Sequence, residues 1–225
     1  MKIASWNVNS LKVRLPQLLD WLAAQQPDVV CLQESKLDDP LFPKLEIEAA
    51  GYRVAFSGQK TYNGVALLTR EPANDIVFGN PFYPDPQKRL LAATVRGIRI
   101  VCAYVPNGQA VGSDKYAYKL AWLDALSAWI GTQLADNPRL ILAGDFNDWR
   151  KSIHNLLVRE LHLQDAHQNL NQRVARTFPS FRPILPMDRI YLRGFQVRTC
   201  EIMCNTEWRR ISDHCALLAG LSLRY

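Results

Sequence analysis

The sequence lacks the features that mark membrane-spanning, secreted or multi-domain chains. Its longest apolar runs are far shorter than the roughly 20 residues that a membrane-spanning helix needs. The opening residues, MKIASWNVNS, become polar too soon for a secretory signal peptide. No Ser-, Gly- or Pro-rich linker, low-complexity tract or short repeat interrupts the 225 residues, of which 48% are hydrophobic. We therefore expect a single α/β domain over residues 1–225, located in the cytoplasm and without a membrane partner.

Cysteine and histidine are scarce and scattered. The five cysteines are an odd number in mostly apolar segments, which favours a reducing compartment over a disulfide framework. Cys200 and Cys204 are four residues apart, but no second Cys/His pair with zinc spacing accompanies them. Of the four histidines, only His214 adjoins an acid, Asp213, at the start of an apolar run. The others lie on or beside a polar helical segment and are expected to be solvated: His154, His162 and His167.

The formal net charge of +6 is concentrated in the last third of the chain. Residues 151–225 contain 11 Lys and Arg against 6 Asp and Glu, and ten of those 11 are Arg. The planar guanidinium group of Arg suits phosphate, so the excess is consistent with a polyanionic partner. Because many basic proteins bind no nucleic acid, charge alone does not decide the partner.

Seven β-rich apolar runs alternate with three helical patterns. The runs cover residues 2–8, 28–34, 64–70, 99–106, 139–147, 187–192 and 216–223. An apolar stripe at helical spacing passes through Leu15, Leu18, Leu19 and Leu22, a longer helix is predicted from about Lys115 to Leu134, and a shorter one over residues 152–163. This order predicts a four-layer αββα sandwich of two packed mixed sheets flanked by helices, although periodicity alone supports only an α/β fold.

Polar side chains gather at the ends of these apolar runs. Such ends converge when strands share one edge of a sheet core, so we expect one mouth lined with acids and amides. The residues in question are Asn7, Asn9, Glu34, Tyr104, Asn107, Asp145, Asn147, Asp188, Asp213 and His214. Carboxylates and amides without a cysteine or multi-histidine cluster suit a hard cation, and therefore Mg²⁺ or Mn²⁺.

Such a set could hydrolyse a phosphodiester. This reaction needs a positioned water, a base and charge stabilisation at phosphorus, which Asp145, Asn147, His214 and a metal at Glu34 would supply. Asp188 opens an apolar run, and a buried carboxylate is costly unless it is paired, for example with His214. Taken singly, each residue also fits a structural role, such as a turn, a strand cap or a strand aromatic.

Several motifs together resemble a known family. In chain order they are SWNVNSLKVRL, PDVVCLQESKL, NGVALLTR, YVPNG, SDKYAYKLAWLDAL and LAGDFN. Over about the first 147 residues they resemble exonuclease III-type apurinic/apyrimidinic endonucleases of the endonuclease/exonuclease/phosphatase superfamily. The resemblance implies the DNase I-like four-layer fold and Mg²⁺-dependent phosphodiesterase chemistry.

The resemblance also implies roles for individual residues. Asn7 and Glu34 would lie at the metal and the phosphate, with Asp213 near the metal. The catalytic group would consist of a water-activating Asp145, a phosphate-binding Asn147, an Asp188–His214 pair, and a Tyr104 that contacts the scissile phosphate or the leaving group.

After about residue 147 the sequence departs from that family. Exonuclease III-like enzymes usually carry a long insertion and a Trp-rich loop, whereas this chain has GDFNDWRKS, TFPSFRP and WRRISDHCALL. These segments resemble a separate, little-characterised branch of the same superfamily. The chain is therefore interpreted as a hybrid, natural or engineered, with a join near residues 140–150.

The missing loop leaves substrate choice open. Asn9 and Asn107 are expected to contact the substrate, while Phe178 and Phe181 either line an apolar wall or pack their loop onto the core. Our first hypothesis is a monomeric Mg²⁺-dependent phosphodiesterase that acts on duplex DNA at abasic sites or 3′ ends, as an endonuclease or exonuclease. The alternatives are the same chemistry on RNA, a nucleotide or a phospholipid head group, and a folded hybrid with weak or no activity.

Overall fold

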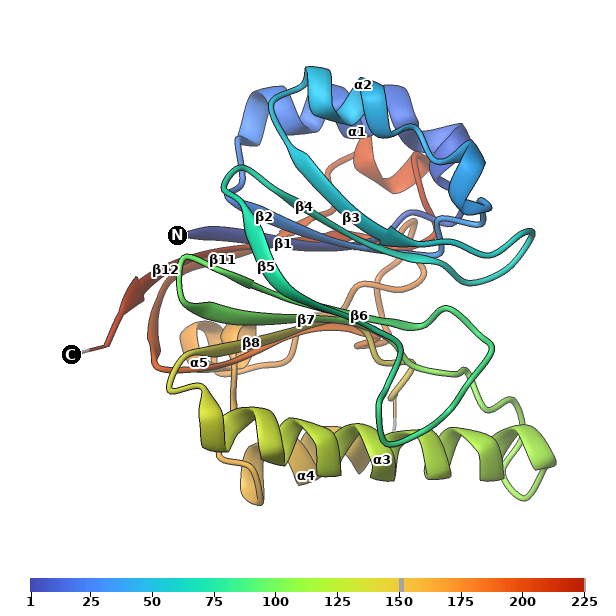
Figure 1. Cartoon of the computed structure of the whole chain (residues 1–225), viewed down its shortest axis with the longest axis vertical. Coiled ribbons are helices and arrows are strands. Elements are labelled where there is room, and N and C mark those ends of the chain that lie inside the picture. Colours follow the sequence, from blue (N-terminus) through green and yellow to red (C-terminus); the bar gives the residue numbers. More distant parts are fainter. Residues whose placement is uncertain (150–151, 225) are drawn as a thin grey trace.

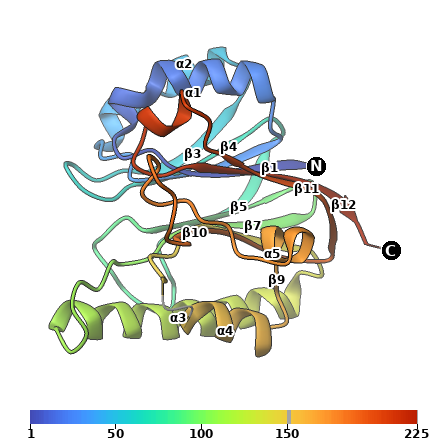
Figure 2. The ribbon, with the colours of Figure 1, turned by 180° about the vertical axis from the view of Figure 1, so that it is seen from behind.

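The computed structural model describes residues 1–149 and 152–224 and has four layers (Figure 1). Two six-stranded sheets face one another, and helices cover the outer face of each. The reverse view shows the same layering (Figure 2). The αββα sandwich predicted from the sequence is thus confirmed. Within the described residues, no helix is both long and apolar enough to cross a membrane.

The first sheet contains both ends of the described chain. Its strand order is β11-β12-β1-β2-β4-β3, and only β1 and β2 run parallel. The strands are β1 (Lys2–Asn7), β2 (Val29–Gln33), β3 (Arg53–Ser57), β4 (Val65–Thr69), β11 (Phe195–Met203) and β12 (Ala216–Leu223). Its helical segments are α1 (Leu11–Gln25), η1 (Asp39–Leu41), α2 (Lys44–Ala49) and η2 (Trp208–Arg210).

The second sheet is built from the middle of the chain. Its strand order is β5-β6-β7-β8-β10-β9, and only β7 and β8 run parallel. The strands are β5 (Ala73–Phe78), β6 (Leu90–Val95), β7 (Ile98–Tyr104), β8 (Leu140–Asp145), β9 (Gln164–Asp165) and β10 (Asp188–Arg193). The associated helices are α3 (Asp114–Asp136), α4 (Ser152–Arg159) and α5 (Ala166–Asn171).

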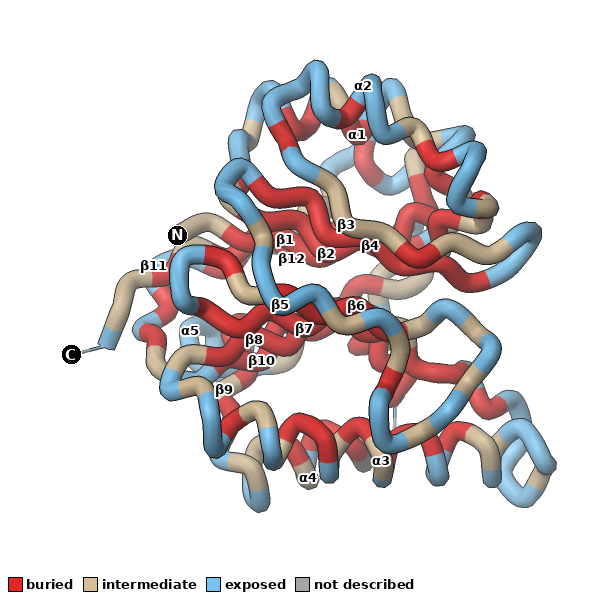
Figure 3. The backbone as a smooth tube through the Cα atoms, viewed as in Figure 1, coloured by how far each residue is buried: buried red, intermediate tan, exposed pale blue. Residues whose placement is uncertain are grey.

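Buried hydrophobic residues form three layers, one between the sheets and one under each helical layer. Figure 3 marks the buried residues along the backbone. In the layer beneath α1, Trp6, Trp21 and Trp208 meet edge to face, with ring centroids 5.0–6.1 Å apart. Strands β1, β2, β4, β7 and β8 are buried along nearly their whole length, which explains why their sequences read as continuous apolar runs.

All seven predicted strands are present, but one predicted helix is shorter. The helix expected over residues 152–163 ends at Arg159. His162 adopts a left-handed φ of 54°, and the Leu163 amide turns back to the Leu157 carbonyl. This bend buries Leu163 at the cost of the last helical turn. The long helix α3 starts at Asp114, because the Ser113 side chain accepts a hydrogen bond from the Tyr116 amide as an N-cap.

The register of the strands brings the polar strand ends together. Tyr104 on β7 pairs with Asp145 on β8, and Asp145 pairs with Asp188 on β10. In the facing sheet, Asn7 on β1 pairs with Gln33 on β2, directly before Glu34. The convergence expected from the sequence therefore occurs at one edge shared by both sheets.

Candidate active site

Asn7 connects the two sheets at this edge. Its Nδ2 atom donates to Glu34 Oε1 and to Asp145 Oδ2, each at 2.9 Å. The Asn7 side chain is completely buried, and its Oδ1 accepts a hydrogen bond from the Asn9 amide. Because Glu34 follows β2 and Asp145 ends β8, a single amide fixes the spacing of carboxylates on opposite sheets.

Glu34 is held as an ionised carboxylate. Tyr104 OH donates to its Oε1 at 2.8 Å, and Lys36 Nζ lies 2.8 Å from its Oε2. Burial alone would raise the pKa of Glu34, but hydrogen bonds from Asn7, Lys36 and Tyr104 lower it below its usual value. Burial and the charges of Glu34 and Asp145 raise the pKa of Tyr104 far above its usual value, so this phenol stays protonated as a donor.

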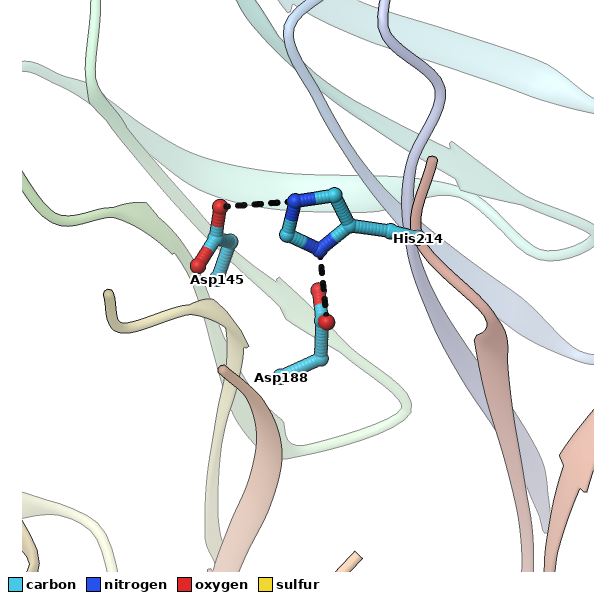
Figure 4. A group of neighbouring side chains, drawn as sticks. All are labelled: Asp145, Asp188 and His214. Atoms are coloured by element: carbon cyan, nitrogen blue, oxygen red, sulfur yellow. Dashed lines mark hydrogen bonds and ion pairs between the residues drawn. The ribbon is translucent and has the colours of Figure 1, made fainter. Parts of the chain in front are cut away.

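On the other side of Asn7, two acids flank one imidazole (Figure 4). His214 Nδ1 is 2.8 Å from Asp188 Oδ2, and its Nε2 is 3.8 Å from Asp145 Oδ2. Burial alone would lower the pKa of His214, but the charges of Asp188 and Asp145 raise it to about 10. Burial, together with the charge of Asp188, raises the pKa of Asp145 to about 7, although His214 acts in the opposite direction. The site thus combines an imidazolium with a carboxylate that titrates near neutrality.

Asn147 is fixed beside Asp145 by its backbone and its side chain. It has a left-handed φ of 48°, its amide donates to Asp145 Oδ1 at 2.9 Å, and its Nδ2 donates to the Val105 carbonyl at 3.0 Å. The buried Lys119 on α3 donates from Nζ to the Asn147 carbonyl at 2.6 Å. The turn after β8 is therefore anchored to a helix in the outer layer.

Residues from both ends of the chain support the acid and imidazole groups. The Asp188 amide donates to Thr177 Oγ1 at 3.1 Å, and Trp6 Nε1 donates to the His214 carbonyl at 3.3 Å. The Phe178 ring packs against the His214 ring with centroids 4.8 Å apart. Among the described residues, Asp188 Oδ1 is buried without a hydrogen-bond donor.

A cleft of about 490 Å³ opens beside Glu34 and Tyr104. It is lined by cations, amides and aromatic rings rather than by aliphatic side chains. The guanidinium carbon of Arg89 lies 4.7 Å from the centroid of the Tyr104 ring, and Lys36 and Lys115 also line the cleft. Its charge and polarity fit an anionic, hydrogen-bonding substrate better than an apolar one.

Asp145, Asp188 and His214 have ligand atoms within 4.8 Å of one another, close enough to share one metal ion. A divalent metal nevertheless fits better beside Glu34. His214 already binds Asp188, and its raised pKa keeps both ring nitrogens protonated, whereas a metal needs a neutral imidazole. Glu34 is ionised and lines the cleft, and its Oε2 has one acceptor site left beside the one that Lys36 Nζ occupies. Its carboxylate and the neighbouring amide are oxygen ligands of the kind that a hard cation prefers.

Residues 4–214 match the Endonuclease/Exonuclease/phosphatase family. The chain belongs to this family. This membership, together with the exonuclease and endonuclease structures described next, shows that the protein is a hydrolytic enzyme of the nuclease type. Because the match extends over both sheets, the cluster around Asn7 lies inside the family's own fold rather than in an added segment.

Three solved structures of this fold are similar over nearly the whole chain. A 3′-5′ exonuclease from Neisseria meningitidis is 34% identical, with a TM-score of 0.91 over 99% of this chain and 100% of that one. A Neisseria 3′ phosphatase bound to a product DNA hairpin is 33% identical, with a TM-score of 0.91 over 99% of both chains. An AP endonuclease from Archaeoglobus fulgidus is 28% identical, with a TM-score of 0.89 over 99% and 100%. These comparisons confirm the resemblance to exonucleases and AP endonucleases.

The predicted join near residues 140–150 gains no support from these comparisons. Each of the three structures matches this chain on both sides of that region as one continuous fold. Arg150 lies outside the described residues, and the join stays a prediction.

The remaining predicted site residues differ in how close they lie to the cluster around Asn7. Asn9 Oδ1 accepts a hydrogen bond from Lys36 Nζ at 2.5 Å, and Asn107 lines the cleft with Glu34. Asp213 is exposed and accepts a hydrogen bond from Ser212 Oγ at 3.3 Å. Phe178 contacts His214, whereas Phe181 is 71% exposed.

Two histidines expected to be solvated are in fact buried. His154 packs its Nδ1 3.0 Å from Tyr191 OH, and His167 Nδ1 lies 2.7 Å from the Arg173 carbonyl. The prediction was wrong because their helices are short and pack against the second sheet, so polar neighbours in sequence did not imply an exposed face. His162, in contrast, is exposed as expected.

Sequence reasoning missed three cations that shape this site: Lys36, Arg89 and Lys119. Lys36 follows Glu34 by two residues, and Arg89 directly precedes β6, so each gave only a weak positional signal. Lys119 gave a stronger one. It occupies the apolar stripe of α3 with Trp122 and Leu123, and a lysine on a buried face needs a partner.

Proposed function

We propose that the protein is a Mg²⁺-dependent phosphodiesterase that hydrolyses DNA at 3′ ends or at abasic sites. The observation that carries this proposal is the continuous contact chain from Glu34 through Asn7 and Asp145 to His214 and Asp188. It supports the proposal because an ionised carboxylate, a second carboxylate that titrates near neutrality and an imidazolium lie beside one another. The similar enzymes described above, a 3′ phosphatase, a 3′-5′ exonuclease and an AP endonuclease, support DNA as the substrate.

In this mechanism Asp145 accepts the proton of the attacking water. A pKa of about 7 suits a general base at neutral pH, and the bonds from the Asn7 side chain and the Asn147 amide orient the carboxylate. The protonated His214, held by Asp188, donates to a phosphate oxygen as negative charge develops there. In this proposal Asn147 binds a second phosphate oxygen, for which its Nδ2 would leave the Val105 carbonyl or Asp145.

Tyr104 and Glu34 act on the cleft side of the scissile phosphate. Tyr104 remains a phenol, and in this proposal its single donor turns from Glu34 Oε1 to the phosphate or to the leaving oxygen when substrate binds. Glu34 and Asn7 would hold the metal, and Asp213 would lie near it. When bound, the metal supplies Lewis-acid stabilisation of the phosphate charge. Mn²⁺ would fit the same oxygen ligands.

The test compares the purified protein with Glu34→Gln and Asp145→Asn on one panel of substrates with Mg²⁺. The panel contains abasic duplex DNA, duplex DNA with a 3′ phosphate, single-stranded DNA, single-stranded RNA and bis(p-nitrophenyl) phosphate. We expect turnover of a duplex DNA substrate and a loss of about 10²–10⁴ in kcat for Asp145→Asn, the size of a general-base contribution. Asp124→Asn, an exposed acid on α3, is the matched control and should keep parental activity.

The same panel decides between the alternatives. Faster turnover of RNA or of the small diester than of any DNA would replace DNA as the proposed substrate. Absence of turnover on every substrate would favour a folded protein with little activity. Parental rates of DNA cleavage by both site variants would refute the assigned chemistry.

A further inference from the structure

A second cavity lies on the opposite flank of the catalytic acids from the cleft at Glu34. Its volume is about 640 Å³, and its lining comes from α5, the segment before β10, the end of β11 and η2. In the second sheet, Tyr104 and Asp188 lie on opposite sides of Asp145. The cleft belongs to the Tyr104 side, whereas this cavity is formed by segments that adjoin the Asp188 side.

Three arginines give this cavity its charge: Arg173, Arg176 and Arg209. All three are exposed, and Gln168 and Gln172 add amide groups to the wall. Within residues 1–149 and 152–224, no ion pair joins any of these guanidinium groups to an acid. Arg209 Nε donates to the Cys204 carbonyl at 2.8 Å, which orients one guanidinium. Three uncompensated guanidinium groups around one hollow form a strongly anion-attracting surface.

The loops that carry these arginines are fixed to the catalytic segments. Thr177, which follows Arg176, accepts a hydrogen bond from the Asp188 amide at 3.1 Å. Ser180 Oγ donates to the carbonyls of Arg209 and Ser212 at 3.0 and 2.6 Å, and Ser212 lies two residues before His214. An anion bound in the cavity would therefore be held at a defined position relative to Asp188 and His214.

We propose that this arginine cavity binds a second backbone phosphate of the nucleic acid whose scissile phosphate lies at Asp145. The inference rests on the proposed function. It extends that function because it assigns a second phosphate of the same substrate to Arg173, Arg176 and Arg209. The guanidinium fork matches phosphate oxygens in pairs, and contacts of this kind fix register without reading bases. The cavity would thus hold the part of the DNA strand that lies beyond the reacting nucleotide.

The experiment measures binding of a duplex oligonucleotide with a 3′ end by fluorescence anisotropy across a range of salt concentrations. EDTA is present, so that binding is separated from turnover. We expect Arg173→Gln, Arg176→Gln and Arg209→Gln each to weaken binding and to reduce the slope of log K against log salt by about one. Arg193→Gln is the matched control, because Arg193 is exposed at the other end of β10, roughly 17 Å along the strand from Asp188.

A second measurement separates binding from damage to the catalytic loops. Turnover of bis(p-nitrophenyl) phosphate, which is too small to reach both sites, should stay at the parental rate in all three variants. An equal loss on the small diester and on DNA would overturn the proposal, because it would mean that the arginines only support the loops. An unchanged salt slope in all three variants would also overturn it.

Two further outcomes distinguish this proposal from the proposed function. If the parent binds DNA with arginine-dependent salt sensitivity but cleaves none, the arginine site is supported and the proposed function fails. If the parent binds no DNA at low salt, both fail. Calorimetric titration with inorganic phosphate tests the other source of the same anion: arginine-dependent binding of free phosphate without a change in the DNA salt slope would assign the cavity to a small anion and overturn the proposal.

Discussion

Asn7 illustrates how much one residue can organise in this molecule. Its single amide nitrogen bonds to Glu34 on one sheet and to Asp145 on the other, so the two carboxylates keep a fixed separation. The two carboxylates differ in their charge state at neutral pH. Glu34 is ionised and faces the cleft, whereas Asp145 titrates near neutrality next to the imidazolium of His214. Two acids in one mouth thus serve different purposes because their environments differ.

Tyr104 should contribute to catalysis through its hydroxyl group alone. Tyr104→Phe keeps the ring beside Arg89 but removes the donor to Glu34, and we expect kcat to fall by about 10²–10³, as for loss of one donor to a transition-state oxyanion. Steady-state kinetics on the preferred DNA substrate measure this. Tyr62→Phe is the control, since Tyr62 lines the same cleft but is 68% exposed. Equal losses in both variants would contradict the assigned role.

The Asp188–His214 pair should make stability depend on pH in a defined direction. The pKa of His214 is raised from 6.5 to about 10 in the folded state, so its stabilising contribution is complete below pH 6.5 and is lost as pH rises through about 10. The difference in unfolding free energy between the parent and His214→Gln should therefore shrink between those pH values. Urea denaturation at a series of pH values measures it, and a difference that grows with pH would contradict the pairing.

For individual residues, the sequence predicted which side chains lie near one another better than it predicted their hydrogen bonds and ion pairs. That Asn7, Glu34, Asp145 and His214 meet could be inferred, because each stands at the end of an apolar run. The hydrogen bond from Asn7 to Asp145 could not be inferred, because it depends on how the two sheets face one another. Long-range packing of that kind leaves no periodic pattern. The pairing of Lys36 with Glu34 depends on the local conformation of the loop after β2, which the sequence did not indicate.

At the scale of elements, β8 determines the geometry of the site. It lies between β7 and β10, and its last two residues, Gly144 and Asp145, are adjacent to Ala103 and Tyr104. A Cβ atom at Gly144 would lie 1.8 Å from the Ala103 carbonyl oxygen. The glycine before Asp145 is therefore required for close approach of the two strands.

Gly144→Ala should separate β8 from β7 and displace Asp145. We expect a loss of about 1–3 kcal/mol in unfolding free energy, as for overpacking in a core, together with a marked loss of activity. Gly131→Ala provides the control on α3, where the nearest atom would be 3.9 Å away and alanine favours the helix. Thermal denaturation and kinetics on both variants test this, and a fully active Gly144→Ala protein would refute the role of the close approach.

The strands that the sequence identified are mostly buried, but burial was not sufficient, because the buried strand β6 was missed. The seven predicted strands include the central ones, whose apolar runs are continuous. Strand β5 was missed because it is mostly exposed, and β9 because it has only two residues. The short helices α2 and α5 were missed for the same reason, since six residues do not establish a helical stripe.

Considered as a whole, the molecule should unfold as one unit. The hydrophobic layer between the sheets contains residues from both, and the first sheet includes β11 and β12 from the far end of the chain. We propose on this basis that residues 1–225 form a single domain, and we expect one cooperative transition in calorimetry with equal calorimetric and van't Hoff enthalpies. Two resolved transitions would indicate independent halves and would favour the predicted join.

The pairing of β1 with β12 also bears on synthesis at the ribosome. The first sheet cannot be completed until β12 has emerged, and His214, which completes the acid and imidazole group, directly precedes that strand. A nascent chain would therefore carry Asn7 and Glu34 for most of its translation, and Asp145 for about the last third of it, without the complete acid and imidazole group. We expect hydrolytic activity to appear only once β12 has paired with β1, because His214 joins the two acids when this pairing forms.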